Sequence, residues 1–128
     1  MGSDVTKTAA LQAWFEQFMT AYPSTAVPDD VIYPYLTYEA QTSAYNGDAS
    51  SEAYIAVQLY FYTESEAVPN AAAEQISKAI GAGGILLHCD DGHIWVMRGS
   101  PWCIPFNDTV SPSIKGRRLN VTLRFLTD

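Results

Sequence analysis

The sequence has few positive charges. Lysine and arginine together number seven, against fourteen aspartate and glutamate residues, and the formal net charge is −7 at pH 7. Binding to nucleic-acid phosphates depends on a basic surface that neutralises them. We therefore expect no nucleic-acid partner.

Cysteine is scarce and long apolar runs are missing. The two cysteines, Cys89 and Cys103, are too few for a disulfide framework, so we expect two reduced, mostly buried thiols. No apolar run approaches the roughly 20 residues that a membrane-spanning helix needs, and we expect no membrane partner. The opening residues, MGSDVTKTAALQAW, lack the basic and apolar regions of a secretory signal. These features predict a protein made and kept in a cytoplasm, or assembled there into something larger.

The sequence also lacks catalytic and cofactor-binding signatures. It contains no nucleophile-elbow, P-loop or dinucleotide-binding pattern. The glycine-rich run Gly81–Gly84 follows a predicted helix instead of preceding one, which is typical of a helix C-cap and turn and not of a phosphate cradle. We predict a protein that is not an enzyme and that needs no cofactor.

The densest group of metal-ligating residue types is the run His88–His93, HCDDGH. His88 and Cys89 are adjacent on a predicted strand, so their side chains point to opposite faces. His88 and His93 flank a tight turn and can meet as a cross-strand pair, which supplies two ligands at best. The spacing predicts no metal site.

A different kind of site stays open near the tryptophans. Cys103 lies between Trp102 and Ile104, an apolar setting in which a thiol is usually inert, although a cysteine–histidine pair need not be close in sequence. The alternative function is therefore a small ligand-binding domain or enzyme. Its pocket would lie near Trp95, Trp102, His88 and His93.

The clearest pattern in the chain is Glu52–Thr63, EAYIAVQLYFYT. Every second residue is apolar, and the positions between them include three tyrosines. A period of two, with β-branched and aromatic residues, predicts a long central strand. We expect the apolar face to receive the helices and the tyrosine face to lie on the far side of the sheet. The apolar set is Ala53, Ile55, Val57, Leu59 and Phe61, and the tyrosines are Tyr54, Tyr60 and Tyr62.

Weaker patterns predict the remaining elements. Helices are expected at Thr8–Tyr22, capped by Asp4 or Thr6 and ended by Pro23, and at Asn70–Ile80, capped by Asn70 and ended by Gly81. Pro34 marks the start of a strand that forms an antiparallel hairpin with Glu52–Thr63. The predicted strands are Leu36–Ala44, Glu52–Thr63, Ile85–Cys89, His93–Arg98 and Arg118–Leu126, with Asp90–Gly92 as a tight turn and Gly99–Pro112 irregular.

These elements predict one α+β domain over residues 1–128. A mostly antiparallel sheet of about four to five strands would form one layer, and the two helices would pack on one of its faces.

Charge is distributed unevenly along the chain. Residues 1–80 hold ten acids and two bases, while residues 81–128 hold four acids and five bases. Such a chain either binds copies of itself head to tail or folds so that its two parts neutralise each other. Tyrosine is enriched at protein interfaces, although a tyrosine face can also be simply half wet. The candidate contact residues are Arg117, Arg118 and Arg124 on one side, Asp29, Asp30, Glu64 and Glu66 on the other, and Tyr54, Tyr60 and Tyr62 on the sheet.

The order of elements and one short run suggest a family. The run is Ile32–Glu39, IYPYLTYE, which lies between the first helix and the long strand ending in Leu59–Thr63. In this pattern the chain resembles the tail terminator and tail-to-head joining (minor tail) proteins of long-tailed bacteriophages and prophages. A head-completion or other neck protein fits nearly as well.

The resemblance implies a structural role in a virion that is assembled in the host bacterial cytoplasm. Subunits would form a ring, a hexamer in the family, that caps the tail tube and joins it to the head. The implied partners are other copies of the chain, the tail tube protein and a head–tail connector or neck protein. The family has no catalytic residues to carry over.

Overall fold

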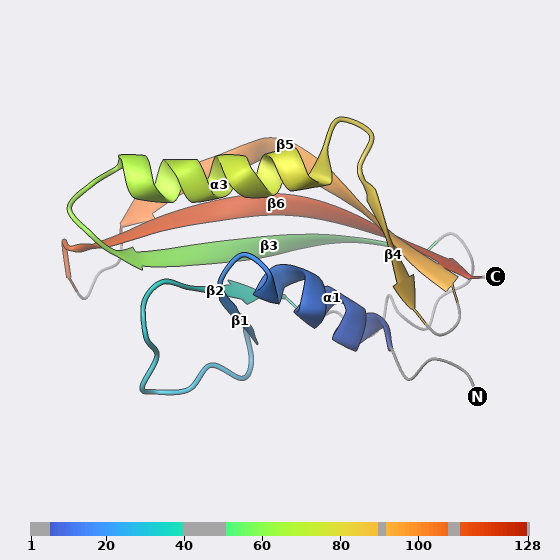
Figure 1. The fold of residues 1–128 in the computed structure, drawn as a ribbon, viewed down its shortest axis with the longest axis horizontal. Coiled ribbons are helices and arrows are strands. Elements are labelled where there is room, and N and C mark those ends of the chain that lie inside the picture. Colours follow the sequence, from blue (N-terminus) through green and yellow to red (C-terminus); the bar gives the residue numbers. More distant parts are fainter. Residues whose placement is uncertain (1–5, 40–50, 90–91, 108–110, 128) are drawn as a thin grey trace.

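The computed structural model describes residues 6–39, 51–89, 92–107 and 111–127. It has an α+β fold of two helices and a six-stranded sheet (Figure 1). The elements follow the order α1 (Lys7–Glu16), β1 (Thr20–Pro23), β2 (Tyr35–Tyr38), β3 (Ser51–Tyr62), α3 (Ala67–Ile80), β4 (Ile85–Cys89), β5 (Gly92–Asn107) and β6 (Ile114–Thr127).

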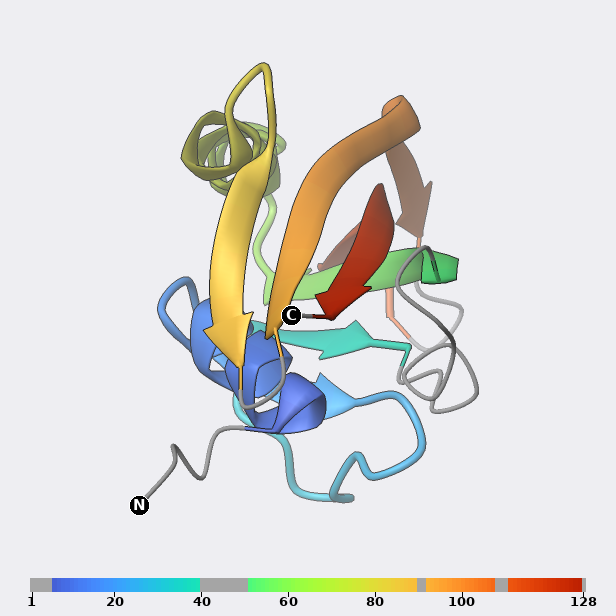
Figure 2. The ribbon, with the colours of Figure 1, turned by 90° about the vertical axis from the view of Figure 1, so that its right-hand side faces the viewer.

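The sheet is curled into a half-barrel with the strand order β1-β2-β3-β6-β5-β4. The β1–β2 pair is parallel and every other neighbouring pair is antiparallel. Both helices lie on the same, concave side of the sheet (Figures 1 and 2). The predicted α+β class is confirmed, but the sheet has six strands where four or five were expected.

The core fills the concave side of the sheet. The predicted inward residues of β3 are all buried, and so are those of β6 from Leu119 to Phe125. Leu11 and Phe15 of α1 are completely buried among them, as are Ile76 and Ile80 of α3 to within 2% exposure. Helix α1 contacts both β1 and β4, the two edges of the sheet, and therefore closes the open side of the half-barrel. The expectation that β3 receives the helices on its apolar face is confirmed.

The first helix ends six residues earlier than predicted. It stops at Glu16, and the apolar residues that follow lead into β1. The amide of Ala21 donates to Glu16 Oε2 at 2.7 Å, and the Ala21 carbonyl accepts from Gln12 Nε2 at 2.9 Å. The helical periodicity of the sequence continues through this segment. These bonds and the pairing of β1 with β2 nevertheless stabilise an extended conformation there. The Thr6 cap is confirmed, since its Oγ1 accepts from the Ala9 amide at 3.1 Å.

The second helix starts three residues earlier than predicted. Glu66, not Asn70, is its N-cap, and Pro69 lies in the first turn, where a missing N–H removes no helical bond. The Asn70 side chain is instead used by a distant arginine, described below. Gly81 ends the helix as predicted, with a φ of 78° that favours glycine.

The segment predicted as irregular is mostly strand. β5 continues through Asn107 with a register shift between Arg98 and Cys103. This irregularity accommodates Gly99 and Pro101, so both flanking segments pair with β6 in spite of the proline. β6 itself begins at Ile114, four residues before the predicted start. The Asp90–Asp91 turn, and the part of the first hairpin that falls in 40–50, lie outside the described residues.

Candidate functional site

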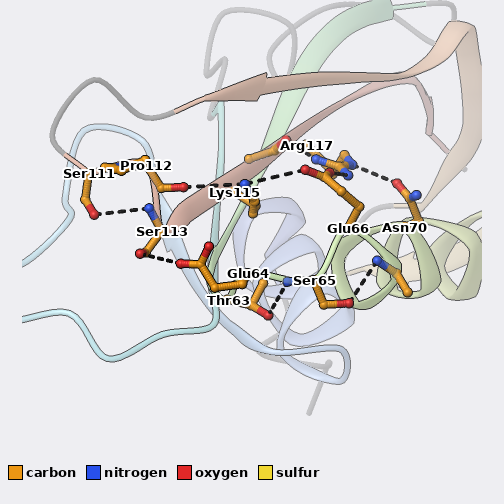
Figure 3. A network of polar contacts seen from close by, with 12 residues as sticks. Thr63, Glu64, Ser65, Glu66, Asn70, Ser111, Pro112, Ser113, Lys115 and Arg117 are labelled. Atoms are coloured by element: carbon orange, nitrogen blue, oxygen red, sulfur yellow. Dashed lines mark hydrogen bonds and ion pairs between the residues drawn. The ribbon is translucent and has the colours of Figure 1, made fainter.

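Arg117 lies at the centre of a polar network beside the start of α3 (Figure 3). Its guanidinium donates to Glu66 Oε1 at 2.5 Å, to Asn70 Oδ1 at 2.9 Å and to the Gly116 carbonyl at 2.8 Å. The residue is only 3% exposed. The guanidinium of Arg117, a predicted contact residue, is thus satisfied by groups of its own chain.

The same network includes Glu64 and Lys115. Ser113 Oγ donates to Glu64 Oε1 at 2.7 Å, and Lys115 Nζ lies 3.5 Å from Glu66 Oε2. These contacts join the connector between β3 and α3 to the beginning of β6. Glu64 and Glu66 remain solvent-exposed, but each has a partner in the chain.

The network changes the acidity of one carboxyl group. The hydrogen bond from Arg117 stabilises the charged form of Glu66 and lowers its pKa below the ordinary value of 4.5. Charge attraction from Arg117 and Lys115 acts in the same direction, while partial desolvation opposes it.

A second ion pair lies on the convex face of the sheet. Arg124 Nε is 3.6 Å from Glu52 Oε2, and the Tyr54 hydroxyl donates to Glu52 Oε1 at 2.7 Å. Because this bond holds the phenol proton beside a carboxylate, it raises the pKa of Tyr54 above 10.0. Arg124 is therefore also partnered within the chain.

Three of the predicted charged residues have no partner in the described part of the chain. They are Arg118 on the convex face and Asp29 and Asp30 in the connection from β1 to β2, and all three are exposed. The structure therefore divides the predicted contact charges. Arg117 and Glu66 pair with each other, Arg124 pairs with Glu52, and Glu64 accepts a hydrogen bond from Ser113, whereas these three have no such contact.

A row of six aromatic rings crosses the convex face at one end of the sheet. We call it the outer aromatic row. Tyr35 and Tyr60 stack at 4.8 Å between ring centroids, and Tyr60 meets Phe106 edge-on at 5.7 Å. Tyr33 contacts Tyr35 and Tyr62 at 5.3 and 6.0 Å. The row comprises Tyr22, Tyr33, Tyr35, Tyr60, Tyr62 and Phe106.

Apolar surface is exposed in and near this row. Tyr62 is 66% exposed and Ile104 on β5 is 42% exposed, while Ile32 in the β1–β2 connection is 81% exposed. Tyr54, further along β3, is 70% exposed. Large aromatic and aliphatic side chains open to solvent on one face are typical of protein-binding surfaces.

Beside the row, the convex face is hollowed. The hollow has a volume of about 360 Å³ and involves β3, β5, β6 and the residue after β2. We call it the outer hollow. Arg118, Asn120 and Thr122 of β6 line it together with Tyr54 and Glu39, and the Glu39 carboxylate accepts from the Ala56 amide at 2.7 Å. Small residues, Ala56 and Gly99, leave the space open.

The residues of the alternative pocket do not form one site. His88 and His93 meet as the predicted cross-strand pair, with ring centroids 4.6 Å apart, and His88 lines a groove between α1 and β4. Trp95 donates to the Gly83 carbonyl at 2.9 Å. Trp102 lines a different pocket, about 240 Å³, between α3 and β5. Within the described residues, no three potential ligands lie close enough together to hold a metal ion.

Cys103 lies in that second pocket beside α3. Burial raises the pKa of its thiol above 9.0, and the charge of Arg117 opposes the shift only in part. A thiol with a raised pKa is a poor nucleophile at neutral pH. Neither cysteine forms a disulfide within the described residues, and both are partly buried where mostly buried thiols were expected.

Sequence reasoning missed Ile104 and Phe106 on the convex face and Ile32 in the β1–β2 connection. Ile104 and Phe106 lie in Gly99–Pro112, which was predicted as irregular, and Ile32 precedes the predicted strand, so the sequence assigned none of them to a face of the sheet. Gly116 was also missed, although it lies under the Phe106 ring, where a Cβ would come within 2.3 Å of that ring. The signal in the sequence was the pair of apolar residues Ile104 and Phe106, which are separated by one residue, as on one face of a strand.

No protein-family model, curated protein or solved structure matches this chain. No helix among the described residues is long and apolar enough to cross a bilayer.

Proposed function

We propose that this protein is a structural subunit of a phage or prophage tail, of the tail-terminator kind, which forms a ring that caps the tail tube and joins it to the head connector. The observation that carries the proposal is the outer aromatic row with its exposed neighbours. A face of tyrosine, phenylalanine and isoleucine side chains, supported by a rigid sheet, is the chemistry of a protein interface.

The remaining features are compatible with a role in assembly. Among the described histidines, cysteines and acids no three gather as a metal site, and burial raises the pKa of the Cys103 thiol. The charged network around Arg117 stabilises the subunit itself. The convex face stays open for contacts with another copy, the tube protein or a neck protein.

The first experiment measures mass in solution at rising protein concentration and at lowered salt, with negative-stain electron microscopy of the same samples. We expect discrete rings, and we expect them to bind the ends of tail tubes from the same phage or prophage. A strict monomer that never associates with tubes would contradict the proposal.

A variant connects assembly to the face that carries the proposal. Tyr62→Ser removes an exposed ring from the outer aromatic row, and we expect it to weaken ring formation or tube binding. Val68→Ser is the matched control, because Val68 is 49% exposed on α3, on the opposite side of the sheet. Equal assembly of the two variants would exclude Tyr62 from the interface.

A further inference from the structure

We propose that neighbouring subunits of the ring contact each other through two specific surfaces: the acidic connection between β1 and β2 of one copy docks on the outer hollow of the next. Asp29 and Asp30 supply the charge of the connection, Ile32 supplies its apolar side chain, and Arg118 is their partner in the hollow. The inference rests on the proposed ring function and identifies the contact that builds the ring.

The first support is the pairing of charges within the subunit. All seven lysine and arginine residues of the chain are described. Six of them have an interaction partner, and Arg118 is the one for which the described residues provide none. The partnered six are Lys7, Lys78, Arg98, Lys115, Arg117 and Arg124.

The acids show the complementary pattern. Among the described aspartates and glutamates, Asp29 and Asp30 are the two without a partner. The others accept hydrogen bonds or form ion pairs inside the chain, as Glu16, Glu39, Glu52, Glu64, Glu66 and Glu74 do. One open cation and a pair of open anions therefore remain for contacts between copies.

The second support is the position of these charges in the fold. Arg118 lies on β6 in the middle of the sheet, paired with Gln58 of β3 and Ile104 of β5. Asp29 and Asp30 follow β1 at the edge of the sheet, three strands away. With neighbouring strands roughly 4.8 Å apart, β1 and β6 are separated by about 14 Å. The groups meet through a second molecule, not within one.

The third support is shape. The β1–β2 connection extends away from the sheet (Figures 1 and 2), while Arg118 lines a hollow. Ile32, two residues after Asp30, is 81% exposed on that projecting segment. Tyr54 in the hollow and Ile104 beside Arg118 provide apolar surface that the Ile32 side chain of the next copy can contact. The connection thus offers acidic and apolar side chains, and the hollow offers the open cation of Arg118 with apolar surface beside it. The Glu39 carboxylate also lines the hollow, but it accepts a hydrogen bond from the Ala56 amide.

This contact joins two different surfaces. A head-to-tail contact of this kind generates a closed ring when the rotation between copies closes, and a filament when it does not. It therefore explains how a single type of subunit builds a ring.

The test is a charge exchange. Arg118→Glu places like charges at every contact, and so does the double variant Asp29→Lys/Asp30→Lys. Each is expected to weaken assembly by at least roughly tenfold in concentration, because like charges replace opposite ones. The triple variant, with all three changes in one chain, restores opposite charges and should assemble within about threefold of wild type.

The control is Lys78→Glu, which changes the net charge as Arg118→Glu does but lies on the exposed face of α3. It should assemble as wild type does. Thermal unfolding of each variant is measured alongside, and since every substituted side chain is exposed, we expect folded proteins with little change in melting temperature.

The outcomes separate the two proposals. If wild type forms rings and Arg118→Glu forms them equally well, or if the triple variant is no better than its parents, the contact inferred here is wrong and the ring function stands. If wild type remains monomeric at every concentration and with tubes, the ring function fails and this contact fails with it.

Discussion

Arg117 on β6 and Glu66 at the N-cap of α3 are joined by a hydrogen bond of 2.5 Å, although they are 51 residues apart in sequence. The arginine is buried and the glutamate is exposed. A buried guanidinium needs its charged partner, because an unpaired charge away from water is costly. This pair therefore fixes the start of α3 beside β6, while the buried Ile76 and Ile80 pack the rest of the helix on the sheet.

Removal of the carboxylate should destabilise the protein. Glu66→Ala leaves the Arg117 guanidinium with Asn70 and the Gly116 carbonyl alone, and we expect a clear drop in the free energy of unfolding. Glu74→Ala removes the carboxylate of an exposed pair with Lys78, 3.5 Å apart, and exposed pairs of this type contribute little. Urea unfolding of both variants measures the difference. Equal destabilisation would show that the Arg117–Glu66 pair has no special weight.

The same pair gives a pH dependence. The pKa of Glu66 in the folded protein lies below its ordinary 4.5, so the unfolded chain binds the proton more readily. The stabilisation is complete above that ordinary value and is lost as the pH falls through the lower, folded-state pKa. Wild type should therefore exceed Glu66→Gln in stability at pH 7, and the gap should narrow towards pH 3. A gap independent of pH would contradict this assignment.

Gly116 should tolerate no side chain. A Cβ there would lie 2.3 Å from Cε2 of Phe106, so Gly116→Ala must displace the ring. We expect a loss of roughly 1–3 kcal/mol of unfolding free energy, the usual cost of overpacking. Gly83→Ala is the control, because a Cβ there meets nothing within 4 Å. Phe106 belongs to the outer aromatic row, so displacement of its side chain should also weaken the assembly of the Gly116→Ala variant.

A second variant tests the cause of that effect. Phe106→Leu combined with Gly116→Ala removes the ring that the new methyl group contacts. If the clash is responsible, the double variant should lose less than the sum of the two single losses. Strict additivity in chemical denaturation would indicate that the alanine acts through the strand backbone instead.

The sequence was sufficient to predict the strands whose two faces differ in polarity. In β3 and β6, apolar residues alternate with polar or aromatic ones over many positions, and the buried set matches the predicted one. The sequence was insufficient to predict segments whose conformation is decided by pairing with a strand that is distant in the chain. Thr20–Pro23 continues a helical stripe, but it pairs with β2, and Cys103–Asn107 contains a proline, but it pairs with β6.

The candidate surface was predictable only in part. The tyrosines of β3 were expected on the far face, and Tyr54 and Tyr62 are exposed there. Local charge density, however, does not distinguish Arg118 from Arg117, its neighbour in sequence. The first points out of the sheet and the second lies in the interior, because adjacent strand residues face opposite sides. Their different partners follow from the fold, and no run of basic residues reveals them.

Gln12 should control whether the end of α1 and β1 stay together. Its amide nitrogen donates to the Ala21 carbonyl at 2.9 Å, and its Oε1 accepts from the Tyr38 hydroxyl at 2.5 Å. One helical side chain thus connects α1 to β1 and β2. Gln12→Ala should cost about 1–2 kcal/mol for the lost hydrogen bonds, and hydrogen exchange of the Ala21 amide should accelerate. Gln75→Ala, an exposed glutamine on α3, is the control and should change neither. Unchanged protection at Ala21 would mean that the bond to Glu16 and the pairing with β2 hold β1 without the help of Gln12.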